Sequence, residues 1–82
     1  MLNVALVGFG YWGPNIARNI NNNPNLNLHT ICDMIDENLE KAHKIYASST
    51  NYEKDFNKVL EDKTIDIVAI ATQTSSHYYL IK

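Results

Sequence analysis

The sequence predicts an α/β fold in which a parallel sheet of strand order 3-2-1-4 carries helices on both faces. Short apolar runs alternate with segments of helical periodicity along the 82 residues. Successive runs are separated by more chain than a hairpin needs, which is typical of parallel strands joined by crossover helices. A glycine-rich loop follows the first run, and an aspartate ends the second. These observations together favour a doubly wound sheet.

The first strand and the first helix are predicted on either side of the glycine-rich loop. The apolar run from Asn3 to Val7 is typical of a strand buried on both faces. The next segment then places three apolar residues on one helical face: Ile16, Ala17 and Ile20. Pro14 suits the first helical turn, where its missing N–H costs nothing. The stretch 21–24, Asn-Asn-Asn-Pro, is expected to end the helix.

The second strand is predicted from Leu26 to Cys32. Strict alternation would place Leu26, Leu28, Thr30 and Cys32 on one face and Ile31 on the other. A helix from Asp36 to Tyr46 is expected next, with Asp36 as its cap and Glu37 near its positive end. The segment 48–52 could hold a very short third strand.

The last elements are a helix, a strand and the start of a further helix. Glu53 to Asp62 is predicted to be helical, with three side chains directed inward: Phe56, Val59 and Leu60. Ile65 to Ala71 is the most apolar strand of the chain. A loop over 72–76 should follow, and Ser75 or Ser76 could cap a final helix that begins near His77. The last strand would then have an unpaired apolar edge, which favours self-association.

Composition narrows the classes of partner and compartment. The formal net charge of −2, with lysines interleaved among acids, predicts neither nucleic acid nor a membrane surface as a partner. No apolar run approaches the roughly 20 residues of a membrane span. The single cysteine, Cys32, cannot form an internal disulfide, and we expect a small buried hydrophobic residue in a cytoplasmic protein. No residue pattern suggests a metal site or catalytic residues.

The loop between the first strand and the first helix has the GxGxxG pattern of a dinucleotide site. Its residues are Gly8, Phe9, Gly10, Tyr11, Trp12 and Gly13. In that pattern the first glycine allows the turn, the second lets a pyrophosphate approach the backbone, and the third lets the helix pack on the sheet. The N–H groups at the start of the helix would face the phosphates. Tyr11 and Trp12 could cover the pyrophosphate or simply pack.

Asp33 follows Gly13 by 33 − 13 = 20 residues, which is the spacing at which a carboxylate accepts hydrogen bonds from the ribose of NAD. It would repel the 2′-phosphate of NADP, and neither Met34 nor Ile35 supplies an arginine to offset that. We therefore expect NAD, with Met34 beside the cofactor. The alternative is that the glycines only make a tight turn and Asp33 only caps the second helix.

Polar residues that follow the fourth strand are further candidates. Ligands of open α/β sheets sit beyond the carboxyl ends of the strands, at the switch point of the strand order. Thr72 and Thr74 could reach the nicotinamide half of a cofactor there, and His77 could bind a ribose or a substrate. The alternative for His77 is a solvated residue in the first turn of a helix.

Two segments resemble the glucose–fructose oxidoreductase, inositol dehydrogenase and rhizopine-catabolism (Gfo/Idh/MocA) family. These are residues 7–15, Val-Gly-Phe-Gly-Tyr-Trp-Gly-Pro-Asn, and residues 66–72, Asp-Ile-Val-Ala-Ile-Ala-Thr, with His77 after them. The resemblance covers the whole chain. It implies a Rossmann-type domain and an NAD(P)-dependent oxidoreductase that acts on a sugar, nucleotide sugar or cyclitol. It also implies a homo-oligomer formed through a second domain.

The chain departs from that family in two respects. Gln73 stands where the family usually has proline after the threonine, which weakens the transfer of nearby site residues. The family's Glu-Lys-Pro segment is also missing, so residues 1–82 are expected to be an incomplete NAD-binding domain, cut before the fifth strand. The whole protein would have roughly 300–350 residues. Alternatives are a non-catalytic NAD(P)-sensing module and a site for another nucleotide such as S-adenosylmethionine.

Overall fold

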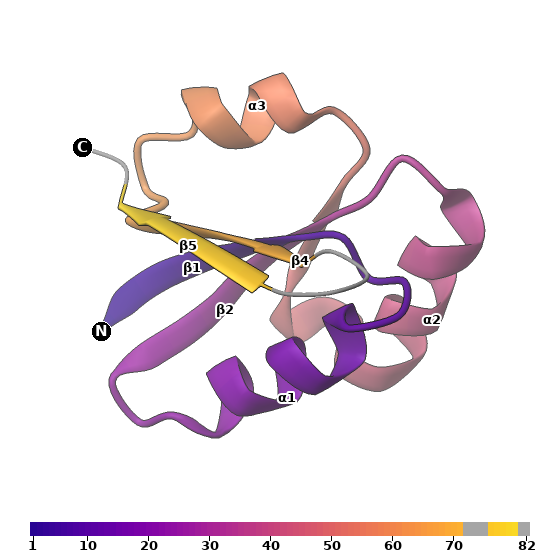
Figure 1. Ribbon diagram of the computed structural model, residues 1–82, viewed down its shortest axis with the longest axis horizontal. Coiled ribbons are helices and arrows are strands. Elements are labelled where there is room, and N and C mark those ends of the chain that lie inside the picture. Colours follow the sequence, from indigo (N-terminus) through magenta and orange to yellow (C-terminus); the bar gives the residue numbers. More distant parts are fainter. Residues whose placement is uncertain (72–75, 81–82) are drawn as a thin grey trace.

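A computed structural model of the chain describes residues 1–71 and the backbone of residues 76–80 (Figure 1). The sheet contains five strands: β1 (Leu2–Val7), β2 (Leu26–Cys32), β3 (Asn51–Glu53), β4 (Ile67–Ala71) and β5 (Ser76–Leu80). Their spatial order is β3-β2-β1-β4-β5, and the first four strands pair in parallel. The predicted order 3-2-1-4 is therefore confirmed.

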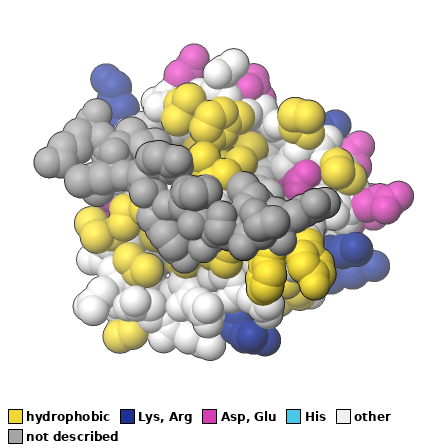
Figure 2. Space-filling view, viewed as in Figure 1, with side chains coloured by type: hydrophobic (Ala, Val, Ile, Leu, Met, Phe, Trp, Pro, Cys, Tyr) yellow, Lys and Arg dark blue, Asp and Glu magenta, His cyan; other side chains and the backbone are white. Residues whose placement is uncertain are grey.

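Helices cover both faces of this sheet, as predicted. The helical elements are α1 (Gly13–Asn22), α2 (Asp36–Tyr46), the short 3₁₀ helix η1 (Ala47–Ser49) and α3 (Phe56–Glu61). Figure 1 shows α1 and α2 on one side of the strands and α3 on the other. Lysine and arginine side chains occur at separate places on the face seen in Figure 2, with acidic groups between them.

The core forms two clusters, one on each face of the sheet. The cluster under α1 and α2 contains Val4, Leu6, Phe9, Ile16, Ala17, Ile20, Leu28, Ile31, Ala42 and Ala69. The cluster under α3 contains Ala5, Cys32, Val59, Ile65 and Val68. Alternate residues of β1 contribute to opposite clusters, as expected for a strand buried on both faces. The central strands thereby hold the loops at their carboxyl ends on a rigid base.

The predicted alternation of β2 is wrong because the strand contains an irregularity. Val4 pairs with Leu28 and Ala5 pairs with Thr30, so His29 is the extra residue of a bulge. One extra residue reverses the alternation beyond it. Leu28 and Ile31 therefore pack into the same cluster, whereas Cys32 packs into the other. His29 itself contacts two threonine hydroxyl groups, Thr30 Oγ1 at 2.7 Å and Thr64 Oγ1 at 3.3 Å.

The two later helices begin differently from the prediction. Ile35, not Asp36, is the N-terminal flanking residue of α2, and Asp36 instead pairs with Lys54 at 3.0 Å. α3 is shorter than expected, because Asp55 caps it by accepting a hydrogen bond from the Asn57 N–H at 2.9 Å. Only Val59 of its three predicted inward residues is buried. Phe56 and Leu60 are 38% and 47% exposed.

The predicted final helix is also wrong, because residues 76–80 form β5. This strand runs antiparallel to β4, with Ile70 opposite His77 and Val68 opposite Tyr79. The edge of β4 is consequently paired, and the expected self-association through that edge loses its basis. The sequence Ser-His-Tyr-Tyr-Leu contains two tyrosines, which favour strands. This preference outweighs the helix start that a serine cap would favour. Ser75 lies outside the described residues.

Candidate functional site

The glycine-rich loop leaves β1 through a backbone conformation that requires glycine. Gly8 has φ = +98°, and a Cβ there would lie 2.9 Å from the carbonyl oxygen of Ala71 in β4. The Gly8 N–H donates to the carbonyl of Cys32 at 2.7 Å. The loop is thus fixed between the carboxyl ends of β2 and β4.

The other two glycines differ in what surrounds them. A Cβ on Gly13 would lie 2.4 Å from the Gly8 carbonyl oxygen, so the start of α1 packs directly against the turn. Among the described residues, a Cβ on Gly10 would meet only the Asn38 amide nitrogen, at 3.8 Å. The protein's own packing therefore requires glycine at position 13 but leaves open space at position 10. Space above a loop backbone is what a pyrophosphate needs, so these residues fit the predicted cofactor.

Asp33 connects the end of β2 to the glycine-rich loop. Its Oδ2 accepts hydrogen bonds from the Phe9 N–H at 2.8 Å and from Asn38 Nδ2 at 3.0 Å. Its Oδ1 accepts one from the Ile35 N–H at 2.9 Å. The carboxylate is therefore held at the loop and not as the cap of α2. The hydrogen bond from the Phe9 N–H to Asp33 therefore links the predicted phosphate loop directly to the predicted ribose-binding acid.

The start of α1 differs from the starts of α2 and α3. Trp12 precedes α1 without a side-chain capping hydrogen bond, Pro14 lies in the first turn, and that turn contains no acidic residue. The start of α2 also lacks a side-chain capping hydrogen bond, but its first turn contains Asp36 and Glu37, and α3 has its Asp55 cap. Uncapped N–H groups and the helix dipole make this end suitable for an anion.

These elements enclose a pocket of about 270 Å³ at the carboxyl ends of β1, β2 and β4. Its lining residues are Gly10, Tyr11, Trp12, Gly13, Asp33, Ile35, Asn38 and Ala71. This position is the switch point of the strand order, where open α/β sheets bind their ligands. The structure thus brings the predicted loop and the predicted acid together in one pocket.

The remaining predicted residues lie in different environments. The Phe9 side chain is 1% exposed and packs into the core cluster under α1 and α2, so it does not line the pocket. Tyr11 and Trp12 form an edge-to-face pair with ring centroids 5.1 Å apart, and Tyr11 is 74% exposed. Met34 is exposed beside Asp33. His77 lies in β5, and Thr72 and Thr74 lie outside the described residues.

Asn38 lines the pocket but was not predicted from the sequence. It lies two residues after the start of α2, and its amide joins Asp33 to the space above Gly10. In the sequence, Asn38 follows Asp33 by only five residues, which places both at the same strand–helix junction. That spacing does not show that the Asn38 amide folds back to bind the Asp33 carboxylate.

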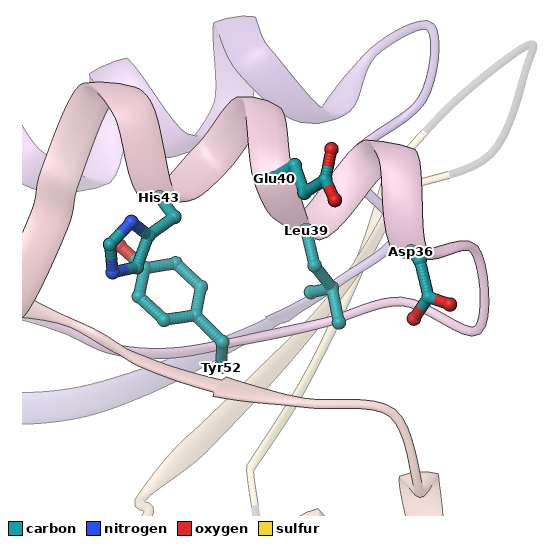
Figure 3. A pocket seen from close by; sticks show the side chains of 5 residues that line it. All are labelled: Asp36, Leu39, Glu40, His43 and Tyr52. Carbon is teal, nitrogen blue, oxygen red and sulfur yellow. The ribbon is translucent and has the colours of Figure 1, made fainter.

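A second hollow of about 330 Å³ lies between α2 and β3 (Figure 3). His43 is exposed and contacts the ring of Tyr52, with centroids 5.1 Å apart. The Tyr52 hydroxyl donates to the carbonyl of Ala47, and Asp36 pairs with Lys54. Asp36, Glu40 and His43 do not converge on one point in Figure 3. This hollow therefore lacks the convergent polar groups of the loop pocket.

The described part of the chain has neither a metal-binding cluster nor a helix that could span a membrane. Within residues 1–71 and 76–80, no cluster of three or more histidine, cysteine, aspartate or glutamate side chains could hold a metal ion. In the same residues, no helix has the length and apolar character of a membrane span.

The glycine-rich loop, the uncapped helix and the acid after β2 define a dinucleotide-binding α/β domain of the Rossmann type. Residues 2–82 match the model of the Gfo/Idh/MocA oxidoreductase family, described as an NAD-binding Rossmann fold. The chain belongs to this family, as the sequence resemblance predicted. The match identifies residues 2–82 as an NAD-binding Rossmann domain of an oxidoreductase family.

The chain is also similar to individual proteins of known name. The glycosyl hydrolase family 109 protein 1 of Bacteroides thetaiotaomicron is 32% identical over 90% of the chain, and the Bacteroides fragilis protein of that name is 31% identical over 94%. An NAD-binding protein from Listeria innocua superposes on 87% of the chain with a TM-score of 0.76 and 27% identity. The chain spans 18% of the length of both curated relatives and 20% of the Listeria protein.

A solved structure of scyllo-inositol dehydrogenase from Lactobacillus casei, with bound NAD(H) and scyllo-inositol, shares the fold. It matches 88% of the chain with a TM-score of 0.74 and 23% identity, and the chain covers 21% of it.

Proposed function

We propose that this chain is the NAD-binding part of a longer oxidoreductase that acts on a hydroxyl group of a sugar, nucleotide sugar or cyclitol. The observation that carries the proposal is the pocket in which Gly10, the start of α1 and Asp33 meet. NAD would supply a nicotinamide ring that exchanges a hydride with the substrate carbon. The residues of this chain would bind and orient it. The catalytic lysine would lie in the Glu-Lys-Pro segment that the family resemblance implies.

Four residues support NAD over NADP in this proposal. The Asp33 carboxylate would repel a 2′-phosphate, and the uncharged Met34 and Ile35 follow it. Lys54 is the cation paired with Asp36, so it is already engaged at the neighbouring turn. We therefore propose that the protein binds NAD at least tenfold more tightly than NADP, a difference of about 1.4 kcal/mol.

The names of the curated relatives favour a second candidate. Both Bacteroides proteins are called glycosyl hydrolases, although they share this cofactor-binding region. Some glycosidases depend on NAD. A glycoside hydrolase of this kind would release a sugar without net production of NADH, because hydrolysis as a whole is redox-neutral.

The test uses the complete protein that contains this chain. NAD and a panel of nucleotide sugars, free sugars and cyclitols are supplied, and NADH absorbance is measured together with sugar release from aryl glycosides. NADH formation supports the oxidoreductase. Sugar release that needs added NAD, without accumulation of NADH, supports the glycosidase. Tight NAD binding with neither reaction would instead favour the sensing module. Failure to bind NAD would exclude the proposal.

Other features of the whole protein stay predictions. The homo-oligomer and the second domain come from the family resemblance, and sedimentation of the complete protein would test the oligomer. The cytoplasmic location comes from the single cysteine. Cys32 is buried and unpaired with another cysteine.

A further inference from the structure

Asn38 joins the two halves of the loop pocket. Its Nδ2 donates to Asp33 Oδ2 at 3.0 Å, and the same atom lies 3.8 Å from the place of a Cβ on Gly10. The side chain is half-buried and lines the pocket. The first turn of α2 fixes its backbone, since the Asn38 N–H donates to the Ile35 carbonyl at 3.1 Å. An amide therefore stands between the acid and the space above the loop.

The partner of this amide determines its orientation. An ionised carboxylate only accepts hydrogen bonds, so Asn38 must turn its NH₂ group toward Asp33. The amide carbonyl oxygen is then directed away from that carboxylate. Asn38 consequently offers a second, oriented acceptor at the wall of the pocket.

The hydrogen bonds of Asp33 show why a second acceptor matters. A carboxylate has about four acceptor positions. Asp33 already uses three of them, for the Phe9 N–H, the Asn38 amide and the Ile35 N–H. A ribose 2′,3′-diol donates two hydrogen bonds, which is one more than the carboxylate can then accept. The side-chain carbonyl oxygen of Asn38 can accept the remaining hydrogen bond, because the same side chain is already bound to Asp33.

We propose that Asn38 is a specificity-determining residue of this site, which orients Asp33 and supplies the second acceptor for an unmodified 2′,3′-diol of the adenosine ribose. The proposal rests on the proposed cofactor function and deepens it. Asp33 and Asn38 recognise the diol as a pair, so the preference for a nucleotide with both hydroxyl groups depends on α2 as well as on β2.

The test is calorimetry on the complete protein with ADP-ribose and with its 2′-deoxy- and 3′-deoxyadenosine forms. In the unchanged protein, loss of either hydroxyl should weaken binding about tenfold. Asn38→Leu should weaken ADP-ribose about tenfold. It should also bring the affinity ratio between ADP-ribose and one of the deoxy forms close to one. Asn38→Ala should also bring this affinity ratio close to one. Alanine is a better helix former than asparagine, so this variant removes the amide without weakening α2.

Asn21→Leu, the same change at an exposed position of α1, is the matched control and should leave every affinity unchanged. If Asn38→Leu and Asn38→Ala weaken all three ligands equally, the residue has only a structural role and the proposal is wrong. The proposal is equally wrong if both variants bind as the unchanged protein does. If the unchanged protein does not bind ADP-ribose, the proposed cofactor function itself fails, and no variant is needed to see it.

Discussion

The Phe9 N–H donates to the Asp33 carboxylate at 2.8 Å, and this hydrogen bond ties the phosphate loop to the ribose acid. The Phe9 side chain is buried in the core, so the loop cannot turn away from the acid without loss of packing. Asp33 thus has two tasks. It holds the loop in shape, and it remains a candidate acceptor for a ribose hydroxyl.

Two substitutions separate these tasks. Asp33→Asn keeps an acceptor for the Phe9 N–H but removes the charge and places an NH₂ group opposite the Ile35 N–H, so we expect a smaller loss of stability than Asp33→Ala causes. NAD should bind about tenfold more weakly, and the discrimination against NADP should shrink. Asp33→Ala removes the charge and the acceptor. It should weaken NAD binding and also lower the free energy of unfolding by about 1–3 kcal/mol. Urea unfolding and calorimetry with both cofactors measure these effects. Equal stability of the two variants would contradict the loop-holding role.

The glycines of the loop give a second pair of contrasting variants. Gly13→Ala places a Cβ against the Gly8 carbonyl oxygen at 2.4 Å, and should destabilise the protein by about 3 kcal/mol. Gly10→Ala places its Cβ in the pocket and should leave stability within about 0.5 kcal/mol, because the nearest atom of the described residues is 3.8 Å away. It should still weaken NAD binding at least tenfold by filling the space for the pyrophosphate. If Gly10→Ala binds NAD as tightly as the unchanged protein does, the pyrophosphate does not lie over Gly10 and this prediction is wrong.

Local periodicity was enough to predict β1, β2 and β4, because each contains apolar residues bounded by polar or glycine residues. It left β3 only a possibility, because Asn51–Glu53 has Tyr52 between two polar residues. It was also enough to place Asp33, since the strand–helix–strand unit fixes the distance from the glycine-rich loop to the end of β2. It could not reveal the bulge at His29, which depends on pairing with β1. It also missed Asn38, whose role arises only when the first turn of α2 lies over Gly10. Such relationships require three-dimensional contacts between elements that are separate in sequence.

Ala47 offers a prediction about stability that is independent of the site. It follows α2 with φ = 46° and ψ = −131°, a conformation that L side chains rarely adopt. Ala47→Gly should remove this strain and raise the free energy of unfolding by about 1 kcal/mol. Ala42→Gly, at a buried position within the same helix, should act in the opposite direction by at least as much. Urea unfolding of both variants tests the pair, and a less stable Ala47→Gly protein would contradict the assignment of strain.

Cys32 gives a prediction about alkaline pH. Burial, and after it the negative carboxylates of Glu53, Asp33 and Asp55, together raise the pKa of its thiol from 9.0 to about 11. A pKa that is higher in the folded state means that the thiol's contribution to stability is complete below pH 9 and is lost as the pH rises through about 11.

The stability difference between the unchanged protein and Cys32→Ala should therefore decrease between about pH 9 and pH 11. Burial also raises the pKa values of Tyr46 and Tyr52, but both proteins contain these residues, so their effect cancels in the difference. In the folded protein at pH 8 the neutral, buried thiol should resist iodoacetamide, whereas the urea-unfolded chain should react readily. Rapid alkylation under native conditions would show that Cys32 is accessible and would refute both expectations.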